Sequence, residues 1–229
     1  MTAIDARSVC ALVLAGGMGS RMGGVDKGLQ LLHGRPLAWH CVERLRAQLG
    51  GAPGLIAINA NRNMETYEAR GCPVWGDELQ GFAGPLAGFH TGLQHCASEE
   101  KATPAAPAIH YLLTVACDTP RFPADLLQRL STALDGASAE IAVAAAAEKG
   151  PDGAMSLRTQ PVFCLMRTEL ADSLAAFLAA GGRKVDAWTS QHRTVTVAFD
   201  QAHDSPQAFF NANTLAELEQ LHGEHYHTA

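Results

Sequence analysis

The chain has 229 residues, of which 47% are hydrophobic and 17% are charged. This composition supports a sizeable buried core and excludes intrinsic disorder, which needs few apolar residues and a high net charge. Because 17 Lys and Arg residues stand against 23 Asp and Glu residues, the net charge is −6, and a general nucleic-acid-binding protein, with its basic surface, is not expected.

Short apolar runs alternate along the chain with segments of helical periodicity. In chain order we expect a strand at Val9–Leu14, a helix at Pro36–Leu49, strands at Leu55–Ile58 and Val74-Trp75, a helix at Pro85–Cys96, a strand at Ile109–Ala116, a helix at Pro123–Leu134, strands at Ile141–Ala146 and Val162–Met166, a helix at Glu169–Ala180, a strand at Thr194–Phe199 and a last helix at Thr214–His222. Two stretches, Ala97–Ala108 and Glu148–Thr159, contain Pro, Gly or polar residues and are predicted to be loops.

Strands separated by helices indicate an α/β fold, namely a single three-layer, Rossmann-like domain with a mostly parallel sheet. We treat residues 1–229 as one domain. The polar stretch near residue 148 is predicted to divide it into a nucleotide-binding half, residues 1–147, and a half for a second substrate, residues 148–229.

The first predicted strand runs directly into a glycine-rich segment, Leu14–Lys27, which has the sequence LAGGMGSRMGGVDK. Ligands of open α/β sheets bind beyond the carboxyl ends of the strands, and glycines let a backbone approach phosphate oxygens closely. Since Arg21 and Lys27 add two cations, the segment predicts an anion-binding loop. It is not a P-loop, because the chain has no Gly-Lys pair, and Met22 stands where the dinucleotide fingerprint needs its third glycine.

Polar residues follow three of the predicted strands. Asp118 comes after the buried run Ile109–Ala116, where a carboxylate can hold Mg²⁺ over a bound phosphate or can cap the next helix. Asn59 ends the second strand and Asp77 follows the third, and both types of side chain serve in turns as well as in hydrogen bonds to a base or a ribose. From the residues alone, both readings stay open at each position.

The motifs together resemble a known family of nucleotidyltransferases. The glycine-rich segment is similar to LAGG-x-x-x-RMGG-x-DK, the signature of the molybdenum cofactor guanylyltransferases. Four further matches follow in the family's order: Asn59–Arg62, Gly84–Gly88, Cys117–Pro120 and Phe210–Thr214. The chain departs from the family pattern at Leu215, where a proline is usual, and this change removes a preorganised first helical turn rather than a chemical group.

The resemblance implies roles for residues of the nucleotide half. Arg21, Lys27 and Asp118 are the expected catalytic residues, and Asp118 is also the expected Mg²⁺ ligand. The expected nucleotide-binding residues are Leu14, Ala15 and Gly16, chiefly through their backbone, and Lys27, Asn59, Asp77 and Asp118 through their side chains.

Two further groups are expected near the second substrate. Arg183 and Lys184 follow a Gly-Gly helix stop, so they could receive a substrate phosphate or could simply be solvated cations at a helix end. Asn211 and Asn213 precede the last helix. One of them is expected to cap that helix, and the resemblance implies that their segment closes on the metal and the second substrate.

The implied reaction transfers GMP from GTP to the terminal phosphate of molybdenum-molybdopterin, which yields the guanine dinucleotide cofactor and pyrophosphate. The phosphate oxygen attacks the α-phosphorus in line, so Mg²⁺ and the cations act by positioning and charge stabilisation. The implied partners are GTP and molybdenum-molybdopterin, with transient contacts to molybdenum-insertion proteins and apo-molybdoenzymes.

Three alternatives remain. A cytidylyltransferase on the same cofactor typically has LAAG where this chain has LAGG, and sugar-1-phosphate nucleotidyltransferases are usually longer. A non-catalytic GTP-binding carrier of the cofactor would not need the set Arg21, Lys27 and Asp118.

The chain is expected to be cytoplasmic and not to associate with a membrane. No apolar run approaches the ~18 residues of a membrane span, and residues 1–7 lack the basic-then-apolar order of a signal peptide. The 6 cysteines form no C-x-x-C pair, so they are expected to be reduced thiols that act as small hydrophobes.

Overall fold

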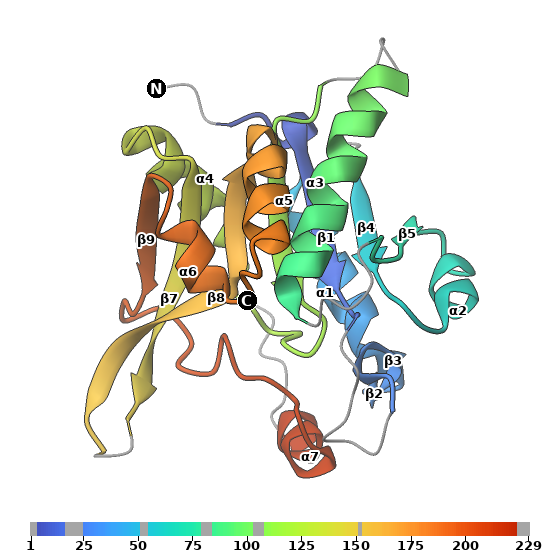
Figure 1. The fold of residues 1–229 in the computed structure, drawn as a ribbon. Coiled ribbons are helices and arrows are strands. Elements are labelled where there is room, and N and C mark those ends of the chain that lie inside the picture. Colours follow the sequence, from blue (N-terminus) through green and yellow to red (C-terminus); the bar gives the residue numbers. More distant parts are fainter. Residues whose placement is uncertain are drawn as a thin grey trace.

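The structure of the chain, a computed structural model, describes residues 4–16, 25–50, 55–78, 84–102, 108–150 and 153–223. Among these residues, seven strands form one sheet (Figure 1). In spatial order the strands are β5 (Val74–Trp75), β4 (Ile56–Asn59), β1 (Val9–Leu14), β6 (Tyr111–Ala116), β8 (Met155–Arg167), β7 (Ile141–Lys149) and β9 (Thr194–Phe199).

All strands of this sheet except β8 run in the same direction. β5, β4, β1 and β6 are neighbours in parallel, β8 is antiparallel to β6 and β7, and β9 is again parallel to β7. The prediction of a mostly parallel sheet is therefore confirmed. The chain builds outward from β1 to β4 and β5 and then returns to β6 on the other side of β1, which makes the end of β1 a topological switch point.

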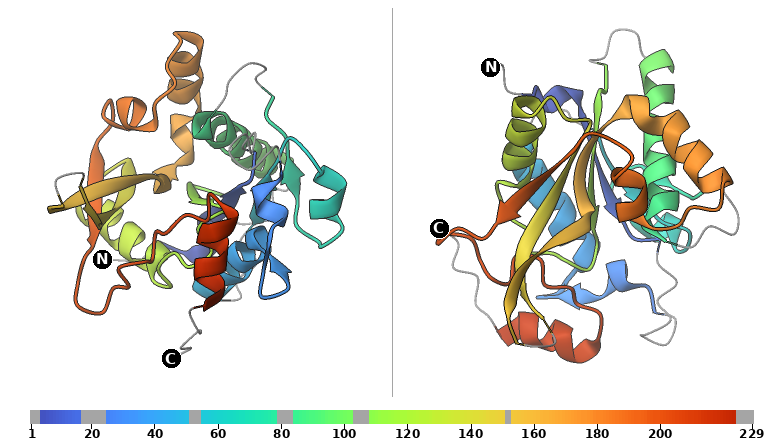
Figure 2. Two further views of the ribbon diagram at one scale, coloured as in Figure 1. Left: turned by 90° about the horizontal axis from the view of Figure 1, so that it is seen from below. Right: turned by 60° about the vertical axis from the view of Figure 1, so that its left-hand side comes forward.

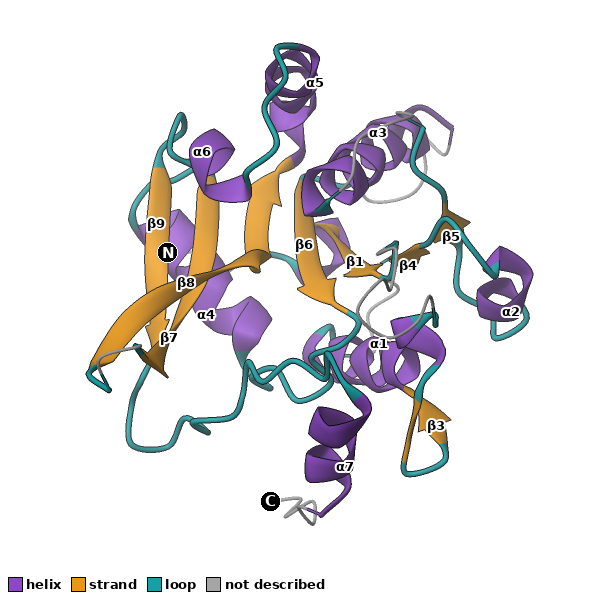
Figure 3. Cartoon of the chain, turned by 60° about the horizontal axis from the view of Figure 1, so that its bottom comes forward, coloured by secondary structure: helices purple, strands orange, loops and turns teal. Residues whose placement is uncertain are grey.

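Helices cover both faces of the sheet, as predicted for a three-layer domain (Figure 3). On one face lie α1 (Leu37–Gln48) and α4 (Leu126–Gly136), and on the other lie α3 (Pro85–Ala102), α5 (Ala171–Ala179) and α6 (Val185–Thr189). The burial of the central strand, β1, shows why helices are needed on both faces of the sheet. Val9, Ala11 and Val13 pack into the first layer while Cys10 and Leu12 pack into the second, and all five are fully buried. A strand buried on both faces reads as a continuous apolar run.

A smaller unit lies below the edge of the sheet at which β1 and β6 end, here called the carboxyl edge (Figure 2). The hairpin of β2 (Leu31–Leu32) and β3 (Arg35–Pro36) packs there against α7 (Leu215–Gly223). Their contact is a separate apolar cluster that includes Leu32, Leu218 and Leu221. This cluster holds the last helix beside the end of the sheet.

Several expected boundaries differ from the structure. The predicted loop Ala97–Ala108 is wrong over its first part, because α3 continues to Ala102. The predicted loop Glu148–Thr159 is also wrong, since it contains the end of β7 and the start of β8. The short elements β2, β3, α2 (Met64–Glu68) and α6 were not predicted, because two to five residues are too few to show a period.

The misread segment is a two-stranded ribbon, residues 147–150 and 153–158, that extends past the carboxyl edge (Figure 1). Glu148 pairs with Ser156 and Lys149 pairs with Met155, and the turn uses Gly153 at φ 79°. Because the side chains of Met155, Leu157 and their neighbours are exposed, the ribbon has no buried face to impose an apolar alternation. The expected boundary between the two halves at residue 147 falls within β7.

Within the described part of the chain, no helix combines the length and the apolar character that a membrane span requires.

Candidate active site

The ends of three parallel strands bring the predicted nucleotide-binding residues together. Leu14 pairs in register with Asn59 of β4 on one side and with Ala116 of β6 on the other. Ala15 and Gly16 continue from β1, and Asp118 stands two residues beyond the end of β6. The predicted loop residue Arg21 lies in 17–24, outside the described residues. The residues at the ends of β4, β1 and β6 therefore lie in one row at the switch point of the sheet.

Asn59 and Asp77 form a paired amide and carboxylate at this edge. The Asn59 Nδ2 donates to Asp77 Oδ1 at 2.8 Å and to the Trp75 carbonyl at 3.0 Å. The Asn61 Nδ2 donates to the other carboxylate oxygen at 2.7 Å, and the Asp77 backbone N–H donates back to Asn61 Oδ1 at 2.8 Å. Asn61 was not singled out from the sequence, although it lies in the same Asn-Ala-Asn-Arg motif, two residues after Asn59.

Two glycines allow close approach to this pair. A Cβ on Gly88 of α3 would lie 2.6 Å from Asn59 Oδ1 and 2.6 Å from Leu14 Cδ2. A Cβ on Gly16 would lie 3.1 Å from the same Asn59 oxygen. The first turns of α3 therefore pack directly on the strand-end groups, which explains a glycine in the Gly84–Gly88 motif.

Lys27 and Asp118 form an ion pair across the carboxyl edge. The Lys27 Nζ lies 3.2 Å from Asp118 Oδ2 and donates to Asn213 Oδ1 at 2.7 Å, and both charged side chains are largely enclosed, with 22% and 17% exposed. Lys27 and Asn213 are 186 residues apart in the sequence, and only the fold brings these three residues together. The structure describes two of the predicted catalytic residues, Lys27 and Asp118, and these two are in direct contact with each other.

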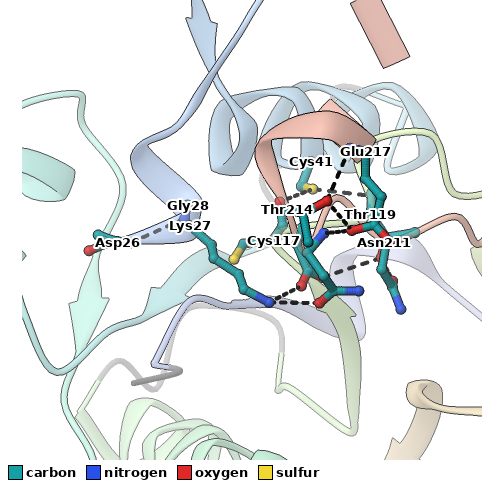
Figure 4. Close-up of polar contacts among 11 residues, drawn as sticks. Asp26, Lys27, Gly28, Cys41, Cys117, Thr119, Asn211, Thr214 and Glu217 are labelled. Carbon is teal, nitrogen blue, oxygen red and sulfur yellow. Dashed lines mark hydrogen bonds and ion pairs between the residues drawn. The ribbon is translucent and has the colours of Figure 1, made fainter. Parts of the chain in front are cut away.

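Residues 210–214, here called the C-terminal segment, attach to the same place (Figure 4). The Ala212 N–H donates to the Asp118 carbonyl at 2.8 Å, and the Thr119 hydroxyl donates to Asn211 Oδ1. The segment leads into α7, whose cap is Thr214, since the Glu217 N–H donates to the Thr214 hydroxyl at 3.1 Å. The prediction that Asn211 or Asn213 caps this helix is therefore wrong, which leaves Asn213 Oδ1 to accept from Lys27.

The predicted phosphate-binding pair Arg183 and Lys184 stands between α5 and α6, and both side chains are exposed. The Arg183 Nη1 donates to the Leu178 and Gly182 carbonyls at 3.1 and 2.6 Å, so it caps the end of α5. This contact fits the helix-stop interpretation. Their part in binding a second substrate stays a prediction.

Two thiols lie beside the ion pair. Cys117 precedes Asp118, and the Cys41 Sγ lies 3.7 Å from the Cys117 carbonyl oxygen. Burial first, and the Asp118 carboxylate second, raise the pKa of both thiols, so they stay protonated and unreactive. All 6 cysteines are free and buried, which confirms their reading as small hydrophobes.

The fold and this edge define a class of enzyme, the α/β nucleotidyltransferases. The family model described as "MobA-like NTP transferase domain" matches residues 11–195. Among solved structures, a molybdopterin-guanine dinucleotide biosynthesis protein A from Archaeoglobus fulgidus superposes with a TM-score of 0.67 at 19% identity, covering 93% of this chain and 97% of that one. A 4-diphosphocytidyl-2C-methyl-D-erythritol synthase from Anaerococcus prevotii reaches a TM-score of 0.64 at 11% identity, covering 96% and 98%, which shows a shared fold.

Curated relatives narrow the class. The molybdenum cofactor guanylyltransferase of Albidiferax ferrireducens is 57% identical over 95% of this chain and 97% of its own length. The enzyme of the same name from Acidovorax ebreus is 54% identical over 96% and 98%. The chain belongs to the molybdenum cofactor guanylyltransferase family.

Proposed function

We propose that the chain transfers GMP from GTP to the terminal phosphate of molybdenum-molybdopterin, with release of pyrophosphate, and that the residues of the carboxyl edge perform this reaction. Family membership supplies the activity. The observation that carries the site is the contact of Lys27, Asp118 and Asn213 beyond the switch point of the sheet. Ligands of open α/β sheets bind at that place.

The nucleotide would lie along the strand ends. The backbone of Leu14, Ala15 and Gly16 would line the nucleotide at the end of β1, where the Ala15 N–H already donates to the Asn59 carbonyl, and the Asn59 and Asp77 pair would face the base or the ribose. Lys27 would give its ammonium to the phosphates, together with Arg21 of the glycine-rich loop. Gly88 lets the first turn of α3 pack directly against Asn59, which holds the Asn59 side chain in place beside Asp77.

The residues present fit a Mg²⁺ ion. Asp118 supplies a carboxylate at the carboxyl edge, and Mg²⁺ prefers one or two carboxylates combined with phosphate oxygens and water. When bound, Mg²⁺ neutralises charge on the phosphoryl group that is transferred. The residue that would hold it is Asp118, whose ion pair with Lys27 keeps the carboxylate directed into the edge.

The reaction needs two things from the protein, namely the positioning of the two substrates and the stabilisation of negative charge on their phosphates. The attacking phosphate of the cofactor is already ionised, so no side chain has to remove a proton. The carboxyl edge has to bring two anions together, and cations around the α-phosphate and the leaving pyrophosphate lower that barrier. Lys27 is the described residue with that role, and its bond to Asn213 ties it to the segment expected to close on the second substrate.

The test is pyrophosphate release with GTP, CTP, ATP or UTP, in the presence of Mg²⁺ and molybdenum-loaded molybdopterin. We expect release with GTP only, and only when the pterin is present. Release with CTP would keep the reaction and overturn the choice of base. Tight GTP binding without release from any nucleotide would favour a non-catalytic carrier.

Contacts with other proteins and a location in the cell follow as expectations from the proposed reaction. Transient contacts with molybdenum-insertion proteins and apo-molybdoenzymes would follow from a product that has to be handed on. A cytoplasmic location would place the chain beside those proteins. The direct check on the first is co-purification of the chain with an apo-molybdoenzyme from cells that make the cofactor.

A further inference from the structure

A buried carboxylate lies next to Lys27 without being part of the ion pair. Asp26 is 8% exposed, and both of its side-chain oxygens are used by neutral donors. The Tyr67 hydroxyl donates to Asp26 Oδ1 at 2.7 Å, and the Asn63 Nδ2 donates to Oδ2 at 3.0 Å. The Gly28 N–H donates to Oδ1 at 3.1 Å. A carboxylate whose oxygens are occupied in this way is not placed to bind a metal or a phosphate. Its role therefore depends on the groups that donate to it.

What Asp26 holds is the backbone that carries Lys27. Asp26 caps the short 3₁₀ helix Lys27–Leu29 through the Gly28 N–H, and this turn fixes the direction in which the Lys27 side chain leaves the chain (Figure 4). The contact is tight, because a Cβ on Gly28 would lie 2.3 Å from the Tyr67 hydroxyl oxygen. A residue larger than glycine would push the tyrosine off the carboxylate.

The other side of the contact is α2, the helix that the sequence did not predict. Asn63 precedes α2 at φ 52°, and Tyr67 within it is fully buried, with its ring stacked on Trp39 at a centroid distance of 5.5 Å. Burial, followed by the bond to Asp26, raises the pKa of the Tyr67 phenol, so the hydroxyl remains a donor at any working pH. The same short stretch of chain supplies Asn59 to the carboxyl edge.

We propose that Asp26, Tyr67 and Asn63 form a positioning brace that aims the Lys27 ammonium at the nucleotide phosphates, with Tyr67 as its main donor. The proposal rests on the proposed role of Lys27 in binding GTP. None of the three residues touches substrate in this assignment. They act through Lys27, because each donor that is lost loosens the turn that sets the position of the ammonium, and misplacement of a charged group by a fraction of an ångström is costly in a phosphate site.

The first variant is Tyr67→Phe, which keeps the buried ring and its stack on Trp39 and removes only the hydroxyl. We expect the Kd for GTP to rise about fivefold and kcat/KM for GTP to fall by about five- to tenfold, with KM for molybdenum-molybdopterin unchanged. Asn63→Gly, which tolerates the positive φ and removes the amide donor, should shift both quantities in the same direction by less. Tyr111→Phe, on the ring that bears Arg167 at the start of β6, is the matched control and should change neither.

A double-mutant cycle separates positioning from general stability. In a Lys27→Ala background, Tyr67→Phe should no longer weaken GTP binding, because the group that it positions is gone. An equal loss in both backgrounds, or no loss with Lys27 present, would overturn the brace. The Kd for GTP is measured apart from turnover. A wild-type chain that binds GTP but releases no pyrophosphate would therefore refute the proposed reaction while the binding cycle still decides on the brace.

Discussion

The two sides of the sheet fix their residues by different means. On one side, β5, β4, β1 and β6 run parallel, and their end residues are locked in register, Leu14 between Asn59 and Ala116. On the other side, β8 runs against its neighbours, and its first part with the end of β7 extends into solvent as the ribbon. A slip of one residue would move every side chain of β1 into the opposite helix layer, where it does not fit, so packing on both faces fixes the register and with it the active edge. The ribbon has no such constraint.

The largest effect should come from the side that burial fixes. Asp118→Asn removes the charge that pairs with Lys27 and the carboxylate proposed for Mg²⁺, while it keeps the shape of the side chain. We expect turnover to fall by about a hundredfold to a thousandfold and the dependence on Mg²⁺ concentration to flatten. Pyrophosphate release over a Mg²⁺ titration measures both, and turnover like that of the wild type would sink the assignment.

The next effect tests how closely α3 is fitted to the strand ends. Gly88→Ala would place a methyl group 2.6 Å from Asn59 Oδ1, so Asn59 has to move from its bond with Asp77. We expect KM for GTP to rise by at least about tenfold. The matched control is Gly92→Ala, one turn further along α3, where the atoms nearest to the methyl group would be those of Leu12 and Leu112 in the core.

The control should lower the free energy of unfolding by about 1 to 3 kcal/mol through overpacking, with KM for GTP unchanged. If both variants changed KM alike, the effect of Gly88 would belong to packing and not to the nucleotide edge. Urea unfolding and steady-state kinetics on the two proteins decide this.

A smaller effect belongs to the other side of the sheet. Asp204, after β9, is 7% exposed and pairs with Arg129 of α4 at 2.7 Å. Burial raises the pKa of Asp204, but the Arg129 hydrogen bond and the Gln201 N–H outweigh it, so the pKa is lowered overall. A carboxyl group whose pKa is lower when folded stabilises the protein above its unfolded pKa, and the contribution is lost as pH falls through the folded value.

Asp204→Ala should therefore cost about 1 to 2 kcal/mol of unfolding free energy at pH 7. The difference from the wild type should shrink as pH falls below ~4, the ordinary pKa of Asp. Thermal unfolding of both proteins across that pH range measures the difference. A constant difference down to pH ~3 would show that the cost comes from lost packing rather than from the charge.

The same contrast explains which features could be predicted from the sequence. The strand at Val9–Leu14 was predicted correctly, and the strand predicted at Ile109–Ala116 begins two residues later, at Tyr111, because strands buried on both faces are almost entirely apolar. The row of Asn59, Asp77 and Asp118 followed from strand ends meeting at one edge. The ribbon was read as a loop because its side chains are exposed, and α2 was missed because five residues show no period. The contact between Lys27 and Asn213 joins residues 186 positions apart, and no local sequence pattern predicts such a contact.

The smallest effect is expected on the ribbon. Two leucines of the same strand, β8, allow an exposed side chain to be compared directly with a buried one. Leu157 is 49% exposed on the ribbon, whereas Leu165, eight residues later, is fully buried between β6 and β7. Leu157→Ala should change the unfolding free energy by less than about 0.5 kcal/mol. Leu165→Ala should cost about 2 to 5 kcal/mol, because it leaves a cavity in the core. Urea unfolding of the two variants measures the contrast. A cost for Leu157 close to that for Leu165 would mean that the ribbon is packed in solution, and the distinction between a side fixed by burial and a side free of it would then fail.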